Sequence, residues 1–194
     1  MRELSLHILD LVQNSIEADA TKVTLEIVEN RRNGNTLLIR VADNGRGMDE
    51  ESCKKVLDPF VTSRTTRRIG LGLSLIQMST KLCEGYLKIT STPGCGTMVE
   101  ALYKHSHLDR PPLGNIVETI KSIVIANPEL DFSYCHTVDK ESFSMSTQEL
   151  VEILGDLPLT KPEVLSWLTE YLRDNLMKLY NIKKPHGGVA SENN

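Results

Sequence analysis

Two glycines closely follow a carboxylate in the run Asp43-Asn44-Gly45-Arg46-Gly47. Glycine has no Cβ, so a backbone that carries two of them can turn sharply and approach a flat ligand closely. A carboxylate beside that turn can accept a hydrogen bond from an exocyclic amine such as that of adenine. The run is also an ordinary hairpin signal, so on its own it fits a plain turn equally well.

Asp10 and Asn14 lie one helical turn apart in a segment, residues 3–18, whose apolar residues recur every three or four positions. Their side chains should therefore project side by side from one face of a helix. A carboxylate and an amide in that arrangement can hold a hydrated Mg²⁺ and orient a water. The alternative is the solvated side of an amphipathic helix, although asparagine is a poor mid-helix residue.

Every residue from Thr62 to Arg68 is an arginine or carries a hydroxyl, and the run Gly70-Leu71-Gly72-Leu73 leads from there into an apolar-periodic segment. A glycine-bearing turn that opens a helix presents backbone N–H groups to an anion. Arg64 and the neighbouring hydroxyls could close over a polyphosphate as a lid. The alternative is a mobile surface loop before a helix.

Hydrophobic periodicity predicts the elements that position these groups. We expect helices at 3–18, 49–56 and 73–83, the second capped by Asp49, and strands at 22–29, 36–43, 86–91 and 96–103. Arg31 and Arg32 fall in the turn between the first two strands, where we expect them to be solvated. Asp43 then ends the second strand.

A polar stretch at 104–112 reads as a linker, and His105 and His107 are interpreted as polar linker residues rather than metal ligands. After it we expect a helix at 113–126 and a hairpin of 131–138 with 141–145, which places His136 on a packed face.

Two capping boxes, Ser146-x-x-Glu149 and Thr160-x-Pro162-Glu163, predict two further helices. The last should end near 180 and include Trp167 in an apolar stripe. Such a stripe is typical of a core, and docking of a partner is the alternative. The tail from 182 to 194 is expected to be disordered.

Composition limits the class of protein. The chain has 194 residues, is 40% hydrophobic and carries a net charge of −4. The sequence has no long basic run, so nucleic-acid binding is not indicated. It also has no apolar run long enough to span a membrane. The four cysteines show no C-x-x-C spacing. We therefore expect a soluble cytoplasmic protein with reduced thiols and neither nucleic acid nor membrane as partner.

Five boxes occur in a fixed order: D-x-x-x-N-S-I-E-A-x-A from Asp10, D-N-G-R-G-M from Asp43, P-F-V-T-S-R from Pro59, G-L-G-L-S-L-I from Gly70 and G-C-G-T from Gly94. Together they resemble the Bergerat-type ATP-binding fold of the gyrase, heat-shock chaperone, histidine kinase and MutL superfamily. The resemblance implies an α+β fold, an α/β sandwich with a mixed sheet covered by helices, over residues 1–104. The resemblance stops there, and the sequence pattern beyond it predicts a smaller α+β C-terminal module at 113–181.

The resemblance also implies site roles. Asn14 would bind Mg²⁺ together with the triphosphate of ATP, and Asp43 would bond the adenine amino group. Gly45 and Gly47 would lie beneath the base, with Thr97 supporting the water beside Asp43. Further nucleotide-binding positions would be Thr62, Arg64, Gly70, Leu71, Gly72 and Leu73.

Asp10 stands where several branches of the superfamily carry a catalytic glutamate, and aspartate is one methylene shorter, which puts its reach to a water or hydroxyl in question. His7 lacks the H-E-x-x-P surroundings of a phosphoacceptor, so we expect any acceptor on a separate protein. The first hypothesis is a protein kinase that acts in trans on a serine or histidine of a partner. The second is an ATP-gated interaction switch with slow or no hydrolysis, which could close by forming a homodimer as MutL-like proteins do.

Overall fold

The computed structural model describes residues 3–57, 70–155 and 157–181, in which six strands form one sheet. Its order is β3-β4-β2-β1-β5-β6. The strands are β1 (Lys22–Asn30), β2 (Thr36–Asp43), β3 (Tyr86–Thr92), β4 (Gly96–Lys104), β5 (Asp131–Val138) and β6 (Glu141–Ser146). The pairing of β1 with β5 is parallel and the other four are antiparallel, so the expected mixed sheet is confirmed.

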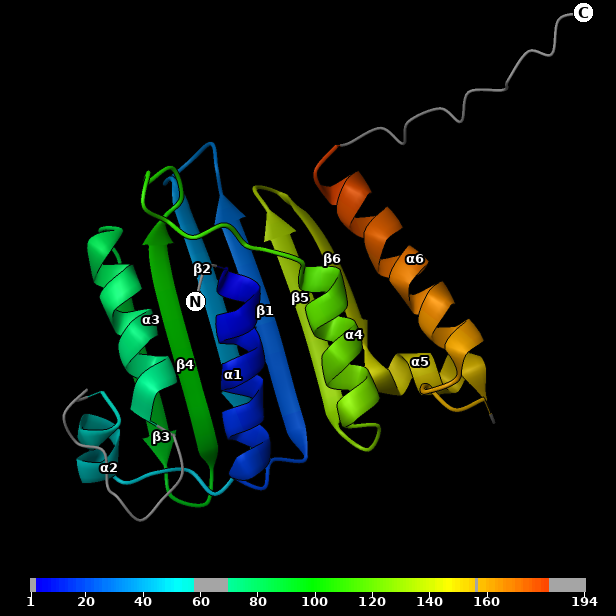
Figure 1. Cartoon of the computed structure of the whole chain (residues 1–194), viewed down its shortest axis with the longest axis horizontal. Coiled ribbons are helices and arrows are strands. Elements are labelled where there is room, and N and C mark those ends of the chain that lie inside the picture. Colours follow the sequence, from blue (N-terminus) through cyan, green and yellow to red (C-terminus); the bar gives the residue numbers. More distant parts are fainter. Residues whose placement is uncertain (1–2, 58–69, 156, 182–194) are drawn as a thin grey trace, which may run out of the picture.

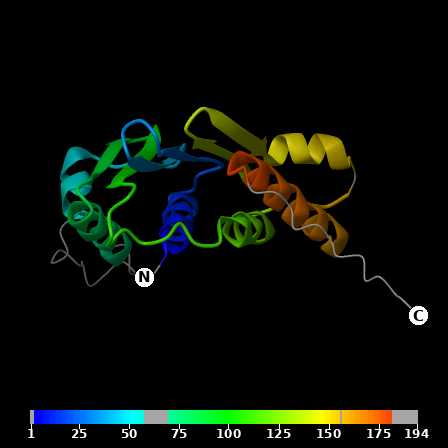
Figure 2. The ribbon, with the colours of Figure 1, turned by 90° about the horizontal axis from the view of Figure 1, so that it is seen from above.

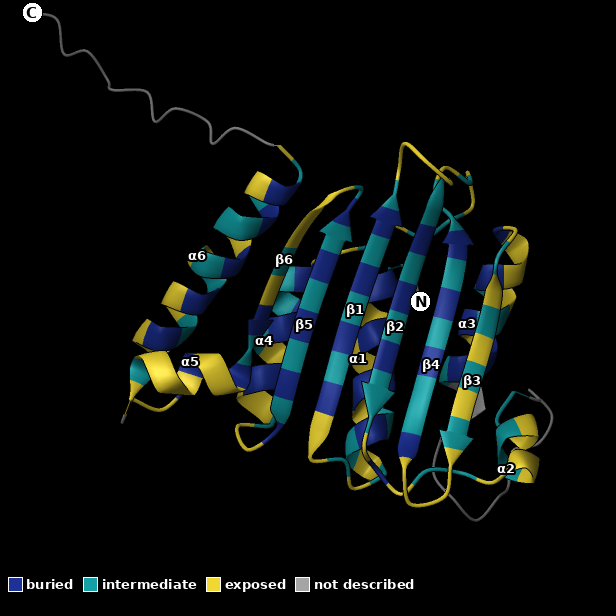
Figure 3. Cartoon of the chain, turned by 180° about the vertical axis from the view of Figure 1, so that it is seen from behind, coloured by how far each residue is buried: buried dark blue, intermediate teal, exposed yellow. Residues whose placement is uncertain are grey.

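The helices lie mainly on one side of this sheet. They are α1 (Leu4–Glu17), α2 (Glu50–Lys55), α3 (Gly70–Leu82), α4 (Ile116–Ala126), α5 (Thr147–Leu154) and α6 (Pro162–Leu179). Helices α1, α3 and α4 cover one face (Figures 1 and 2), while the opposite face stays open (Figure 3). None of the described helices is long and apolar enough to cross a membrane.

The C-terminal residues extend the first sheet instead of building a separate one. β5 lies alongside β1, and β6 continues from β5 as the edge strand (Figure 1). α6 packs against α4 and β6. Leu25 of β1, Phe132 of β5 and Leu168 of α6 belong to one buried apolar cluster, so a single core spans both halves of the chain.

Several predicted element boundaries are confirmed by their caps. The Asp49 side chain accepts a hydrogen bond from Ser52 N at the start of α2, and Ser146 and Glu149 form the predicted capping box of α5. α4 begins at Ile116, later than expected, because Asn115 caps it by accepting from Glu118 N.

The predicted N-cap of α6 was wrong, and so was the core alternative for Trp167. Its N-cap is Lys161, without a side-chain cap bond, because Pro162 takes the first helical position and leaves Thr160 one residue too early. Trp167 is 39% exposed and stacks on Tyr171 instead of entering the core. The buried stripe of α6 is formed by Val164, Leu168, Leu172, Leu176 and Leu179.

A buried carboxylate, Glu29 of β1, ties together segments distant in the sequence. Arg31 donates from Nε and Nη2 to Glu29 Oε2 at 3.0 and 2.8 Å, and His105 Nε2 lies 2.8 Å from the same oxygen. His136 Nε2 lies 3.0 Å from Oε1, which also accepts from the Tyr180 hydroxyl. Arg31, which was expected to be solvated, and His105, which was interpreted as a polar linker residue, are thus partners of a buried group.

These partners decide the ionisation of Glu29. Burial acts to raise the pKa of its carboxyl, but the hydrogen bonds from His136, Tyr180, His105 and Arg31 outweigh burial and hold that pKa well below its usual range. Glu29 is therefore a charged anchor between β1, the linker, β5 and the end of α6.

Replacing Glu29 by glutamine should lower the free energy of unfolding by about 2 kcal/mol near neutral pH, because Arg31 loses its buried counter-charge. The folded-state pKa of Glu29 lies below its unfolded value of 4.5, so its contribution is complete above that pH and is lost as the pH falls further. Urea denaturation at about pH 7 and about pH 3 measures both effects.

Glu26→Gln on the same strand is the matched control, since Glu26 pairs with Arg40 on the open face and should contribute less than about 1 kcal/mol. Equal losses for the two variants at neutral pH would contradict the anchor role.

Candidate functional site

A cavity of about 290 Å³ opens where the C-terminal end of α1 meets the ends of β2 and β4 and the start of α3. Among the residues that line it are four of the predicted site residues: Asn14, Asp43, Gly47 and Thr97. A fifth, Leu73, enters from the first turns of α3. The structure thus brings together residues from four separate sequence boxes.

The Asp43 carboxylate stands at the end of β2 and is held by three donors. Its Oδ1 accepts from the backbone N–H groups of Gly45 at 2.9 Å and Thr97 at 3.0 Å. Its Oδ2 accepts from the Ser15 hydroxyl at 2.7 Å. Because each carboxylate oxygen offers two lone pairs, Oδ2 keeps an acceptor position for a ligand amine.

The loop after Asp43 requires its glycines. A Cβ at Gly45 would lie 2.6 Å from the carbonyl oxygen of Ala18, and one at Gly47 would overlap that of Thr92. Gly47 also has a φ of +66°, in the left-handed region that favours glycine. The sharp turn predicted for this run is therefore present, and its close backbone contacts are with the chain's own Ala18 and Thr92, while Gly47 lines the cavity and Gly45 does not.

Thr97 supports the site through a second hydroxyl. Its Oγ1 lies 2.8 Å from the Ser91 Oγ, and Ser91 in turn accepts from Met48 N at 2.8 Å. This chain joins β4, β3 and the glycine loop, so the residues around the carboxylate form one hydrogen-bonded unit.

Asp10 and Asn14 share α1 but differ in position. Asn14 is half-buried and lines the cavity, whereas Asp10 is exposed and does not. The Asp10 Oδ2 lies 3.6 Å from the point where a Cβ of Gly72 would stand, so it faces the first turn of α3. Gly70 and Leu71 also belong to that helix, which begins three residues earlier than predicted. Thr62 and Arg64 lie outside the described residues.

The sequence-based prediction missed Ser15 and the apolar walls. Ser15 lies one turn after Leu11 on the buried side of α1. Its position next to Asn14 was the only feature of the sequence that could have indicated a role in the site. The walls are supplied by Leu11, Val41, Val99, Met48 and Val56. They form an apolar slot with the Asp43 carboxylate at its end, which suits a flat heterocycle with an exocyclic amine.

Arg46 closes the rim between α1 and the glycine loop. Its backbone N–H donates to the Ala18 carbonyl at 2.8 Å, and its guanidinium donates to the Glu17 carbonyl and lies 3.3 Å from Asp19 Oδ2. A cation at the C-terminal end of a helix is favourable electrostatically. Arg46 therefore holds the loop onto the end of α1.

Ser15→Ala should weaken binding of the adenine nucleotide expected at this site about tenfold, because Asp43 loses a hydrogen bond worth roughly 1.5–3 kcal/mol. Asp43→Asn should abolish binding, since the amide cannot keep two accepting oxygens. Titration calorimetry with a non-hydrolysable ATP analogue measures both. Ser5→Ala, a buried serine on the same helix, is the control, and unchanged affinity in Ser15→Ala would refute the role given to Ser15.

Comparison with known proteins agrees with this geometry. The family model described as "Histidine kinase-, DNA gyrase B-, and HSP90-like ATPase" matches residues 2–107. The signal transduction histidine-protein kinase AtoS of Escherichia coli is 30% identical over 89 residues, which cover 46% of this chain and 14% of AtoS. The DNA mismatch repair protein MutL of Syntrophotalea carbinolica is 28% identical over 166 residues, which cover 66% of this chain and 26% of that protein.

A solved structure described as the N-terminal domain of a DNA repair protein shares the fold, with a TM-score of 0.52 and 18% identity over 75% of this chain and 53% of that one. The chain spans about a quarter or less of the length of the two curated relatives. Since the family match covers more than half of the chain and contains the cavity, the chain belongs to the family of histidine kinase-, DNA gyrase B- and HSP90-like ATPases, with an ATP-binding domain in residues 2–107.

Proposed function

We propose that this protein binds ATP with Mg²⁺ in the cavity at the end of α1 and transfers phosphate in trans to a serine or histidine of a partner protein. The observation that carries the proposal is the Asp43 carboxylate, fixed by three donors at the end of an apolar slot. Bound Mg·ATP would supply the transferable phosphoryl group.

The slot and Asp43 act on the base. Val41, Val99 and Met48 provide apolar surface for the flat ring, and the free acceptor position of Asp43 Oδ2 selects a donor such as the adenine amino group. Guanine has a carbonyl oxygen where adenine has its amino group. An ionised carboxylate cannot donate a hydrogen bond to that oxygen. The site should therefore favour adenine over guanine.

The other end of the cavity suits phosphates. Asn14 offers an amide oxygen that can complete the shell of a Mg²⁺ already held by phosphate oxygens. The first turn of α3, with Gly70 and Gly72, presents backbone N–H groups at the positive end of a helix dipole. The family resemblance suggests that Thr62 and Arg64 also contact the phosphates.

Asp10 is the candidate general base. Its carboxylate is exposed and faces the start of α3, so an incoming hydroxyl or imidazole can reach it from solvent. His7 is an unsuitable acceptor because it is only 5% exposed. Burial lowers the pKa of its imidazole. An acceptor on another protein fits this arrangement, and the similarity to a histidine-protein kinase supports a kinase.

An ATP-gated switch is the second candidate function. The specific observation in its favour is that Asp10 lies outside the cavity lining, while Asn14 on the same helix lies within it. Asp10 is one methylene shorter than the glutamate of related proteins and lies outside the cavity lining, which suits slow turnover or none. The similarity to MutL supports this candidate, with a second copy of the chain or another protein recognising the closed state.

Asn14→Ala should remove the dependence of nucleotide affinity on Mg²⁺, because the amide oxygen is the protein ligand proposed for the ion. Affinity for ATP measured with Mg²⁺ and with chelator should differ in the wild type and converge in the variant. Gln13→Ala, an exposed neighbour on α1, should keep the difference. A variant at Asn14 that still responds fully to Mg²⁺ would rule out this ligand.

Asp10→Asn should leave ATP affinity intact and abolish turnover, since the amide cannot take up a proton. Incubation of the protein and its source lysate with γ-labelled ATP measures transfer and release together. Label on one discrete lysate protein, lost with Asp10→Asn and kept with Asp109→Asn in the exposed linker, would establish the kinase. Binding with neither transfer nor release would favour the switch.

A further inference from the structure

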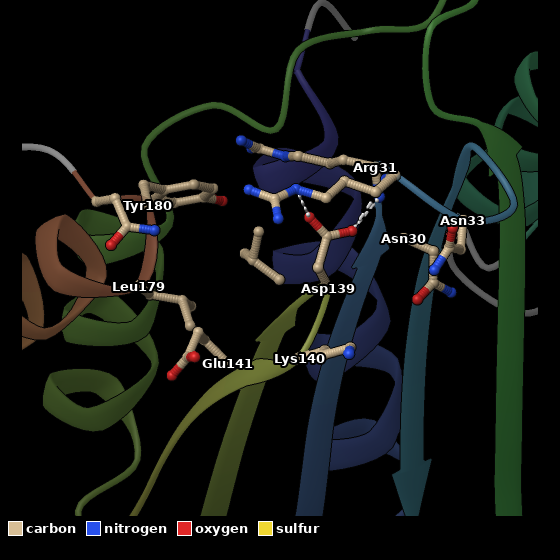
Figure 4. Close-up of a pocket in the computed structure, with 11 residues that line it drawn as sticks. Asn30, Arg31, Asn33, Asp139, Lys140, Glu141, Leu179 and Tyr180 are labelled. Carbon is tan, nitrogen blue, oxygen red and sulfur yellow. Dashed lines mark hydrogen bonds and ion pairs between the residues drawn. The ribbon is translucent and has the colours of Figure 1, made fainter.

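A second cavity, of about 420 Å³, lies between the β1–β2 turn, the β5–β6 turn and the C-terminal end of α6. Figure 4 shows Arg31 and Tyr180 reaching toward each other from opposite sides, with Asp139 below the arginine side chains. Its lining residues are Asn30, Arg31, Arg32, Asn33, Val138, Asp139, Lys140, Glu141, Leu179, Tyr180 and Asn181. None of these residues belongs to the ATP cavity.

The two cavities lie at opposite ends of β1. Lys22 begins the strand, and its backbone N–H donates to Oδ1 of Asn44 in the glycine loop after Asp43. Asn30 ends the strand at the second cavity. Nine residues of strand span about 30 Å. A nucleotide bound at Asp43 cannot place its phosphates in the second cavity, so any ligand there is a separate molecule.

Arg31 is held in place before any ligand arrives. One edge of its guanidinium bonds the buried Glu29, and its charged carbon lies 4.6 Å from the centre of the Tyr180 ring. Within the described residues no hydrogen bond engages its Nη1. A guanidinium fixed on one edge and one face, with donors left over, is suited to binding carboxylate or phosphate.

The charge of Glu29 does not compete for a ligand anion. His136, His105 and the Tyr180 hydroxyl bond the same carboxylate as Arg31, so its negative charge is spread over several donors inside the core. Burial, and then the hydrogen bond to Glu29, raise the pKa of the Tyr180 hydroxyl far above its ordinary value, which keeps the ring neutral beneath Arg31.

Two more cations, Arg32 and Lys140, line the cavity. Of its two carboxylates, Asp139 and Glu141, the first already accepts hydrogen bonds from the protein. Asp139 Oδ1 accepts from the backbone N–H groups of Arg31 and Arg32 at 2.8 and 3.0 Å. Its Oδ2 lies 3.7 Å from Arg32 Nε. Arg32 is otherwise 85% exposed, and Lys140 is exposed with no ion pair to another described residue. The lining thus carries three cations, Arg31, Arg32 and Lys140, against two carboxylates, Asp139 and Glu141, of which Asp139 is already engaged.

The remaining walls set the size and kind of ligand. Asn30, Asn33 and Asn181 offer amides, while Val138 and Leu179 offer apolar surface. A cavity of this volume fits a small organic molecule. We propose that the second cavity binds a small organic anion through its phosphate or carboxylate group, with Arg31, Arg32 and Lys140 as the recognising cations.

The test uses the full chain, labelled with ¹⁵N and saturated with a non-hydrolysable ATP analogue so that the ATP cavity is filled. Glycerol 3-phosphate and succinate are titrated separately, and amide shifts of Arg31, Arg32, Lys140 and Asn181 are followed. We expect saturable shifts at these residues, and the probe that binds more tightly distinguishes phosphate from carboxylate.

Arg32→Gln should weaken that binding about tenfold, because it removes a charge-assisted hydrogen bond, and its exposure makes the fold insensitive to the change. Arg31→Lys keeps the positive charge but removes the planar array of guanidinium N–H donors, so it should weaken binding as well. Arg173→Gln, an exposed arginine on α6, should change nothing. The proposal is overturned if neither probe saturates, if only residues 43–48 shift, or if Arg32→Gln binds as tightly as the wild type.

Discussion

Three hydrogen bonds hold the Asp43 carboxylate, and the rest of the cavity at the end of α1 depends on them. Ser15 reaches it from α1, Gly45 from the glycine loop and Thr97 from β4. A charged group at a strand end would otherwise turn toward water, because burial without donors is costly. Since each donor comes from a different segment, fixing this one carboxylate also fixes α1, the loop and β4 relative to one another.

A second carboxylate, Glu29, plays the corresponding part at the far end of β1. It joins the linker, β5 and the end of α6 through His105, His136 and Tyr180. The sheet continues from β1 to β5 over a shared apolar core. The C-terminal residues are therefore a structural extension of the ATP-binding sheet, and the second cavity forms only where both parts meet.

Local signals explain what could be predicted from the sequence. The alternation of β1, the three-to-four spacing of α1 and the capping box at Ser146 depend on neighbours in the chain, and the structure agrees with them. Asp43, Asn14 and Thr97 could be predicted to lie together because family boxes contain them, and all three line one cavity. Ser15 and Arg31 could not, because their partners depend on tertiary packing. Trp167 was misplaced because its spacing matched the core stripe, and only packing decides which side of a stripe is covered.

The parallel pairing of β1 with β5 also has a consequence for how the chain folds. Glu29 and His136 are 107 positions apart in the sequence, whereas β1 and β2, and β3 and β4, are joined by short turns. Closing a long loop costs entropy before any contact repays it. The hairpins of the ATP-binding half should therefore form early and the docking of β5 late. A nascent chain would then complete the cavity at the end of α1 before the cavity at the other end of β1.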